Sequence, residues 1–141
     1  MNILKSLFRR GGERLLQTET QPAPARSPEP EPPPVQEISP QELKDRLSTG
    51  NGLVVVDMRA GWEYQAGHIP GAVHMFIQDI PARFRELPAD RTIIFQCWHG
   101  NTSLAAAAFL IQHGWPADRV FSLQGGMAGW VQANGMESLE K

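Results

Sequence analysis

The sequence predicts an α/β protein in which a parallel β-sheet lies between layers of helices. Residues 53–57 (LVVVD) and 92–96 (TIIFQ) form short apolar runs, as expected of strands that are covered on both faces. Segments of helix-forming composition alternate with such runs and are joined to them by short connections. Five strands are expected between residues 36 and 123, so we predict a three-layer α/β/α domain around a five-stranded parallel sheet.

The domain is expected to begin with one strand and one helix. Residues 36–39 (QEIS) predict a short strand, after which Ser39 caps a helix that has Pro40 at its first position and Glu42 at its third. This spacing predicts a capping box, in which the Glu42 side chain also binds the Ser39 backbone N–H. The helix runs to about residue 47, and the Gly-Asn-Gly sequence at 50–52 closes it.

The rest of the domain continues the alternation. The His-Ile-Pro-Gly sequence at 68–71 predicts a turn, and three tryptophans, Trp62, Trp115 and Trp130, are expected to pack inside the domain. The expected elements are the strand at 53–57, a short helix at 62–65, a brief strand at 72–75, a helix at 78–86, the strand at 92–96, a helix at 104–112, a strand at 120–123 and a closing helix at 126–134.

The first third of the chain differs from the rest. Residues 18–35 contain seven of the twelve prolines and predict an extended linker that cannot build a core. Before it, residues 1–17 alternate apolar and basic side chains, which is typical either of an amphipathic helix on a membrane or partner, or of a solvated tail. We favour the tail, because isolated helices shorter than ~12–15 residues are marginal in water. The domain then spans residues 36–136, and residues 137–141 form a C-terminal tail.

Composition excludes several function classes. The net charge of −2 argues against a nucleic-acid partner, and the longest apolar runs are too short to span a bilayer. One cysteine permits no internal disulfide, and together with four histidines it matches no metal-ligand spacing, so neither a metal nor another cofactor is expected. The N-terminus shows no continuous apolar segment of a secretory signal, and we expect a cytoplasmic protein.

The sole cysteine, Cys97, lies between the strand at 92–96 and the helix at 104–112. The intervening loop contains Gly100 and Asn101, which tolerate unusual backbone angles. A strand end, a tight loop and a helix N-terminus direct several backbone N–H groups to one spot of positive potential. Because the N–H groups of residues 98–103 would stabilise a thiolate there, Cys97 is predicted to be a reactive nucleophile. In parallel sheets, sites form at this carboxyl end of the strands.

Three segments, in this order, resemble the rhodanese (sulfurtransferase) family over residues 38–134. The first is Val55-Val56-Asp57-Met58-Arg59 with Glu63-Tyr64 and Gly67-His68-Ile69-Pro70-Gly71-Ala72. The second is the Cys97 loop, and the third is Gly125-Gly126-Met127-Ala128-Gly129-Trp130. The loop, in which an aromatic residue, His, Gly and Asn follow the cysteine, is most similar to small single-domain bacterial thiosulfate sulfurtransferases.

The resemblance implies a rhodanese fold and a sulfur-transfer reaction. Cys97 would take the sulfane sulfur of thiosulfate or of another persulfide donor, release sulfite in the case of thiosulfate, and hold a persulfide. A second nucleophile then collects the sulfur: cyanide in an assay, and a small or protein thiol in a cell, for which a thioredoxin-like protein is one candidate partner.

The loop departs from the family in one respect that bears on the substrate. Many members carry an arginine at the position of Thr102, whereas residues 98–103 here contain no Lys or Arg. Only His99 becomes positive, mainly below about pH 6.5. Thiosulfate is a dianion, so we predict weak thiosulfate binding because charge-assisted contacts are lost.

The loop side chains carry open alternatives. Thr102 and Ser103 either donate hydroxyl hydrogen bonds to the bound sulfur species, or one of them caps the following helix. His99 either orients the substrate or is solvated. Trp98 either forms a wall of the pocket or docks a protein acceptor. Gly100 allows the loop to curl. The predicted substrate-binding residues are Trp98, His99, Gly100, Asn101, Thr102 and Ser103.

Two further residues, Asp57 and Arg59, sit at the end of the neighbouring strand. The resemblance implies that they brace the site, and the alternative is a surface ion pair of small worth. His68 is interpreted as a turn residue and not as a catalyst.

Two other functions are compatible with the fold that the resemblance implies. Cdc25-type phosphatases share it, but their loop is one residue longer and ends in an arginine six positions after the cysteine, where this chain has Ser103. Without that arginine a phosphoryl group loses its bidentate clamp, which argues against a phosphatase. The alternative to an enzyme is a docking module or sulfur carrier for a protein partner, although docking domains of this kind often lack the cysteine.

Overall fold

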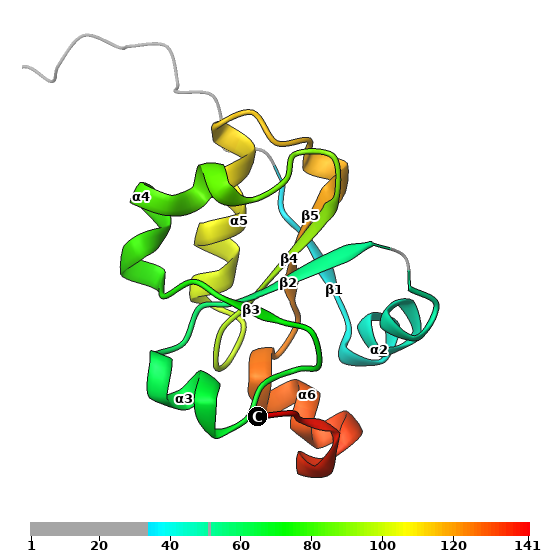
Figure 1. Cartoon of the computed structure of the whole chain (residues 1–141). Coiled ribbons are helices and arrows are strands. Elements are labelled where there is room, and N and C mark those ends of the chain that lie inside the picture. Colours follow the sequence, from blue (N-terminus) through cyan, green and yellow to red (C-terminus); the bar gives the residue numbers. More distant parts are fainter. Residues whose placement is uncertain (1–33, 51) are drawn as a thin grey trace, which may run out of the picture. The chain divides into compact units, whose positions relative to one another are not determined.

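Five parallel strands form one sheet in the part of the chain that the structure, a computed structural model, describes, namely residues 34–50 and 52–141 (Figure 1). They are β1 (Gln36–Ile38), β2 (Leu53–Asp57), β3 (Val73–His74), β4 (Thr92–Gln96) and β5 (Val120–Leu123). Their order across the sheet is β1-β5-β4-β2-β3. The predicted five-stranded parallel sheet is therefore confirmed. The tail expected at 1–17, the linker up to residue 33 and Asn51 lie outside the described residues.

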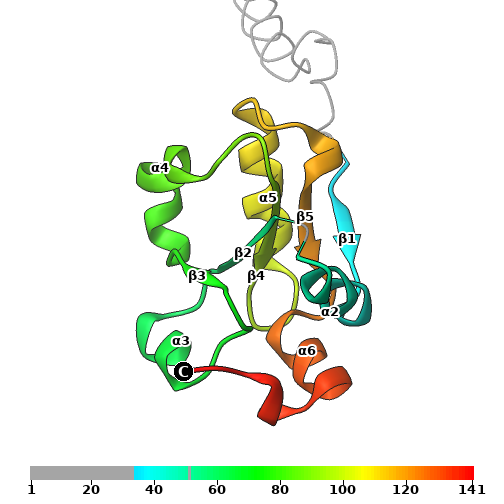
Figure 2. The same cartoon turned by 45° about the vertical axis from the view of Figure 1, so that its right-hand side comes forward.

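Helices cover both faces of this sheet (Figures 1 and 2). They are α2 (Pro40–Ser48), α3 (Gly61–Ala66), α4 (Ile80–Arg83), α5 (Thr102–Gln112) and α6 (Gly126–Asn134). One core cluster joins α4 and α5 to alternate strand residues such as Val56, Phe95 and Val120. The other joins α2 and α6 to the opposite set, such as Val55 and Ile94. Strands buried on both faces explain why the sequence shows apolar runs instead of alternation.

The start of α2 shows half of the predicted capping box. Ser39 is the N-cap, and its side chain accepts a hydrogen bond from the Glu42 backbone N–H at 3.1 Å. The reciprocal bond from the Ser39 N–H to Glu42 was predicted and is wrong. The Glu42 carboxylate instead accepts from Arg46 one turn later, at 3.0 Å, because an i,i+4 pair on an exposed helix face lies within its reach.

The helix predicted at 78–86 is wrong as a single element. The chain forms a 3₁₀ turn at Ile77–Asp79, the short helix α4, and a second 3₁₀ turn at Phe84–Glu86. Pro81 lies in the first turn of α4, where its missing N–H costs nothing, so a regular helix cannot pass through it from the N-terminal side. The broken path still buries Ile80 and Phe84 in the core.

The tryptophan predictions have mixed outcomes. Trp130 is buried, and Trp115 packs partly buried against the core under α5. Trp62 was expected to pack inside and is instead 73% exposed on α3. A six-residue helix that lies at the edge of the domain presents one of its faces to solvent, and the first turn of α3 places Trp62 on that face.

The C-terminal residues fold back on the domain. The backbones of His68 and Glu140 form an antiparallel bridge, and Leu139 packs against the α2–α6 core cluster. Within residues 34–50 and 52–141, no helix combines the length and the apolar character that crossing a bilayer requires.

Candidate active site at the carboxyl ends of β2 and β4

Cys97 directly follows β4 and is almost buried, with 7% of its surface exposed. The loop that follows turns back over the sulfur, so that the Gly100 N–H donates to Cys97 Sγ at 3.1 Å. Ser103 Oγ lies 3.4 Å from the same sulfur. The loop therefore places two hydrogen-bonding groups that carry no formal charge against the sulfur.

These donors determine the ionisation of Cys97. Burial of the thiol raises its pKa, but hydrogen bonds from the Ser103 and Thr102 side chains and from the Ser103 and Gly100 backbone N–H groups outweigh burial. Together they lower the pKa of the Cys97 thiol to about 7. A large fraction of the sulfur is then thiolate at neutral pH, which is the nucleophilic form.

Helix α5 starts earlier than predicted, and this changes the interpretation of two loop residues. It begins at Thr102 instead of residue 104, with Asn101 as its N-cap. Of the two alternatives for these residues, the one in which Thr102 or Ser103 caps the helix is therefore wrong. Both residues lie inside the first turn, where side chains point back toward the preceding loop, and this direction brings their hydroxyls to the sulfur.

Two glycines shape the loop through close backbone approach. Gly100 has φ +92°, and a Cβ on it would meet the Gly125 nitrogen at 2.9 Å. Gly126 has φ +60°, and a Cβ there would lie 2.5 Å from the Cys97 carbonyl oxygen. This approach lets the first turn of α6 hold the loop, because the Met127 N–H donates to the Cys97 carbonyl at 2.7 Å. The Gly125-Gly126 sequence at the start of α6 is thus part of the site.

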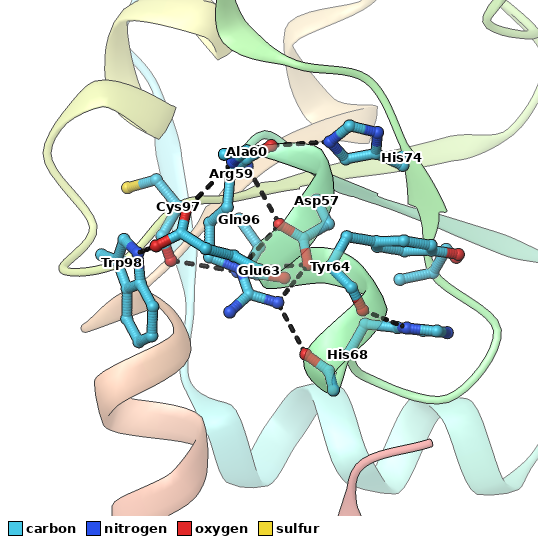
Figure 3. A network of polar contacts seen from close by, with 12 residues as sticks. Asp57, Arg59, Ala60, Glu63, Tyr64, His68, His74, Gln96, Cys97 and Trp98 are labelled. Carbon is cyan, nitrogen blue, oxygen red and sulfur yellow. Dashed lines mark hydrogen bonds and ion pairs between the residues drawn. The ribbon is translucent and has the colours of Figure 1, made fainter. Parts of the chain in front are cut away.

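The neighbouring strand end holds a buried ion pair (Figure 3). Arg59 Nε and Nη2 donate to the Asp57 carboxylate at 2.9 and 2.7 Å, and Nη2 also donates to the Gly67 carbonyl at 2.8 Å. Both side chains are buried, so the alternative of a surface ion pair is wrong. In the sheet, Asp57 pairs with Gln96, one residue before Cys97, which places the ion pair beside the cysteine loop.

Trp98 connects the two strand ends. The Arg59 guanidinium carbon lies 4.9 Å from the centre of the Trp98 ring, in a cation–π arrangement. The Trp98 indole N–H donates to the Glu63 carboxylate on α3, and Glu63 also accepts from the Ala60 N–H at 3.0 Å. Figure 3 shows the Cys97 sulfur pointing away from the Arg59 guanidinium. The charge of Arg59 is therefore directed at Asp57 and not at the sulfur.

A cavity of about 340 Å³ opens beside the sulfur, and we call it the Cys97 cavity. Its lining includes five predicted site residues besides the paired Arg59: Cys97, Trp98, His99, Asn101 and Thr102. Gly100 and Ser103 contact the sulfur from behind the cavity. Sequence reasoning missed five further lining residues, which are Met58, Ala60, Glu63, Phe76 and Ile77. They follow β2, which pairs with the cysteine strand β4, and β3, which pairs with β2. Their position at the carboxyl ends of these strands is the signal that could have found them.

A second hollow, of about 160 Å³, lies next to the Cys97 cavity and shares Arg59, Glu63 and Trp98 with it. We call it the α3–α6 groove. Its other lining residues are Trp62, Ala66, Gly67, Met127, Val131, Met136 and Leu139. Trp62 and Met136 are largely exposed, so an apolar surface extends outward from the reactive sulfur.

His68 lies away from the sulfur, in the turn where it was expected. Its ring stacks on Tyr64 with the ring centres 3.9 Å apart, and its Nδ1 lies 2.9 Å from the Tyr64 carbonyl oxygen. Its role in the described structure is to hold this turn against α3. Among the described residues, no group of three or more His, Cys, Asp or Glu side chains is arranged to hold a metal ion.

Comparison with known proteins places this geometry in a family. Residues 39–133 match the Rhodanese-like domain family. A protein of Allochromatium vinosum named "Sulfurtransferase" is 36% identical over 98 residues, which are 70% of this chain and 90% of that protein. The chain is similar in structure to a rhodanese-like domain protein from Staphylococcus aureus, with a TM-score of 0.66, 26% identity, and 75% of this chain and 97% of that chain covered. A rhodanese-like domain from an Anabaena protein gives a TM-score of 0.62 at 29% identity, covering 74% of this chain and 76% of that one.

Proposed function

The chain belongs to the rhodanese-like domain family, and we propose that it is a sulfurtransferase in which Cys97 carries sulfane sulfur as a persulfide. The family and the sulfurtransferase relative support sulfur transfer in general. The observation that carries the proposal for Cys97 itself is the pair of uncharged groups that hydrogen-bond to its sulfur, the Gly100 N–H at 3.1 Å and the Ser103 hydroxyl at 3.4 Å. A structural cysteine in an apolar core would have no such donors.

In the proposed first step the Cys97 thiolate attacks the outer sulfur of thiosulfate. A bond forms between the two sulfurs, the bond from the sulfane sulfur to the sulfonate sulfur breaks, and sulfite leaves with that electron pair. The product is an anionic persulfide on Cys97, so charge is conserved. The same donors that stabilise the thiolate stabilise the persulfide, and no general acid is required because sulfite leaves as an anion.

In the second step an acceptor attacks the outer sulfur of the persulfide. Cyanide becomes thiocyanate, and a thiolate becomes a new persulfide, while Cys97 returns to the thiolate. The α3–α6 groove supports a protein thiol as the cellular acceptor, because this apolar surface is continuous with the cavity at the sulfur. A thioredoxin-like protein remains our candidate for that acceptor.

We propose that thiosulfate is a weak donor for this site. Among the described residues that line the Cys97 cavity, the only Lys or Arg is Arg59, and its Nε and Nη2 are engaged by Asp57 and Gly67. Glu63, on the same wall, adds a carboxylate. A dianion in this cavity therefore has uncharged donors but no free cation, and a donor of lower charge, such as an organic persulfide, fits the lining better.

Intact mass spectrometry tests the proposal. Wild-type protein is incubated with thiosulfate without reductant, beside a Cys97→Ser variant, and an organic persulfide is used as a second donor. We expect a gain of one sulfur atom in the wild type alone. If neither donor adds sulfur while titration shows a free thiol, Cys97 is not a sulfur carrier.

The α3–α6 groove also favours a second candidate function, a docking module or carrier for a protein partner. Replacement of Trp62, which lines the groove and does not line the Cys97 cavity, separates the two candidates. For a sulfurtransferase with a protein acceptor, Trp62→Ala slows sulfur transfer to reduced thioredoxin and leaves transfer to cyanide unchanged. For a module without catalysis, neither acceptor receives sulfur from the wild type.

A further inference from the structure

A second serine lies behind the cysteine, outside the Cys97 cavity. Ser122 on β5 and Ser103 on α5 are both fully buried, and their hydroxyl oxygens are 2.7 Å apart. Ser103 Oγ is in turn 3.4 Å from Cys97 Sγ. The three side chains come from three elements, β5, α5 and the end of β4, and they form one continuous chain of polar atoms that ends at the sulfur.

Ser122 occupies a position where an apolar residue would be expected. It lies on the same face of β5 as Val120, which belongs to the core cluster under α5. A buried hydroxyl is costly unless it is hydrogen-bonded. Within residues 34–50 and 52–141, the only side-chain hydrogen bond of Ser122 is the one to Ser103. Any effect of the Ser122 hydroxyl beyond packing is therefore expected to pass through Ser103 to the Cys97 sulfur, which Ser103 contacts.

The direction of the hydrogen bonds follows from counting hydrogens. When Cys97 is a thiolate, Ser103 donates its single hydrogen to the sulfur, and its oxygen is then free to accept the hydrogen of Ser122. Both hydroxyl hydrogens are used. When Cys97 is a thiol that donates to Ser103, three hydrogens share two contacts, and one hydroxyl hydrogen is left without a partner among these side chains. The arrangement therefore favours the ionised sulfur.

We propose that Ser122 is a positioning residue for sulfur transfer, which acts through Ser103 to stabilise the anionic sulfur of Cys97. It donates to Ser103 Oγ, orients the Ser103 hydroxyl toward the sulfur and polarises it. This inference extends the proposed function, since the same chain stabilises the persulfide anion. Ser122 itself neither lines the cavity nor forms a side-chain hydrogen bond with the cysteine.

The test is the pH dependence of Cys97 alkylation by iodoacetamide, measured on the full chain. Because the protein has one cysteine, the readout reports this sulfur alone. Four proteins form a cycle: wild type, Ser122→Ala, Ser103→Ala and the double variant. Ser122→Ala is expected to raise the midpoint by roughly half a pH unit, a shift of the size that loss of a fraction of one hydrogen bond produces. Below the midpoint this is about a threefold slower alkylation.

The double variant decides whether Ser122 acts through Ser103. In the Ser103→Ala background, Ser122→Ala is expected to leave the midpoint unchanged. Val120→Ala is the matched control, since it removes buried volume from the same face of β5 without touching the polar chain. It should lower the melting temperature and leave the midpoint at the wild-type value.

Two results would overturn the inference. One is an unchanged midpoint in Ser122→Ala, which would leave the hydroxyl with a packing role only. The other is an equal shift in both backgrounds, which would mean that Ser122 does not act through Ser103. The assay needs no sulfur donor, so it gives its answer even if Cys97 proves to carry no sulfur in the mass experiment.

Discussion

Two adjacent strand ends stabilise a negative charge in opposite ways. At the end of β2, the buried Asp57 carboxylate is held by the full positive charge of Arg59, with N–O distances down to 2.7 Å. At the end of β4, the Cys97 thiolate is held by a backbone N–H and by hydroxyl groups, none of them charged. Asp57 pairs with Gln96, the residue before Cys97, so the two anions lie at neighbouring positions on the same edge of the sheet.

The two environments explain why one anion is structural and the other reactive. A carboxylate in a bidentate ion pair has its lone pairs occupied by its partner. Its reaction would leave the partner's charge buried without compensation, which is energetically costly. A thiolate held by oriented dipoles keeps an open side toward the Cys97 cavity and can pass its charge to a new sulfur without losing an ion-pair partner.

The largest effect is expected from loss of the buried Asp57–Arg59 ion pair. Asp57→Asn keeps the size of the side chain but leaves the buried Arg59 guanidinium without its counter-charge. We expect a loss of about 3–5 kcal/mol in the free energy of unfolding, measured by urea denaturation. Glu86→Gln, which removes an exposed ion pair with Arg83, is the control and should leave stability unchanged. Equal stabilities of the two variants would contradict the account.

The next largest effect is expected when the cysteine loop is displaced. Gly126→Ala introduces a Cβ that meets the Cys97 and Trp98 backbones, at a residue with φ +60°. We expect a loss of roughly 2–3 kcal/mol in stability together with a higher pKa of Cys97, because the loop is displaced.

Gly71→Ala provides the matched control for this substitution. Gly71 also has positive φ, but a Cβ there meets nothing within 4 Å. It should cost less stability and leave the alkylation midpoint of Cys97 unchanged. If the alkylation midpoint of Gly126→Ala equals the wild-type value, the close approach of Gly126 to the cysteine loop does not affect the ionisation of Cys97.

A cation added to the cysteine loop is expected to change the affinity for thiosulfate. Thr102→Arg places a free cation at the mouth of the Cys97 cavity, and we expect the KM for thiosulfate to fall by about tenfold, as a charge-assisted contact allows. Thr102→Gln is the control, since it also removes the hydroxyl but adds no charge. Steady-state assays with cyanide measure both. The same KM in the two variants, or micromolar binding by the wild type, would show that charge does not limit the donor.

The smallest effect is expected from the N-terminal third. Both strand ends lie within the described residues, so removal of residues 1–33 should change neither the alkylation midpoint nor the rate of sulfur transfer to cyanide. A change of either one would assign these residues a part in the site.

The strands and the cysteine loop could be predicted from the sequence because their signals are local. The apolar run at Leu53–Asp57 has the bounds that were expected, and the lone Cys97 between a strand and a Gly-Asn loop was sufficient to propose a nucleophile. Local signals failed where Pro81 divides a helix-like segment and where Trp62 faces solvent.

The rest of the site depends on contacts between distant segments. Glu63 and Phe76 line the cavity only because β2, β3 and β4 are adjacent in the sheet. The burial of the Asp57–Arg59 pair depends on how α3 and the following turn cover it, which no pattern along the chain records. Ser122 is a small residue in a strand, and only its distance from Ser103 gives it a role.

The pH dependence of wild-type Cys97 alkylation, measured at low and at high salt, tests whether uncharged donors stabilise the thiolate. If uncharged donors of the loop stabilise the thiolate, the midpoint lies near pH 7 and does not move when salt is added. A midpoint near that of an unperturbed thiol, about pH 8.5, would contradict the account, and so would a midpoint that rises with salt, since that behaviour marks stabilisation by a cation.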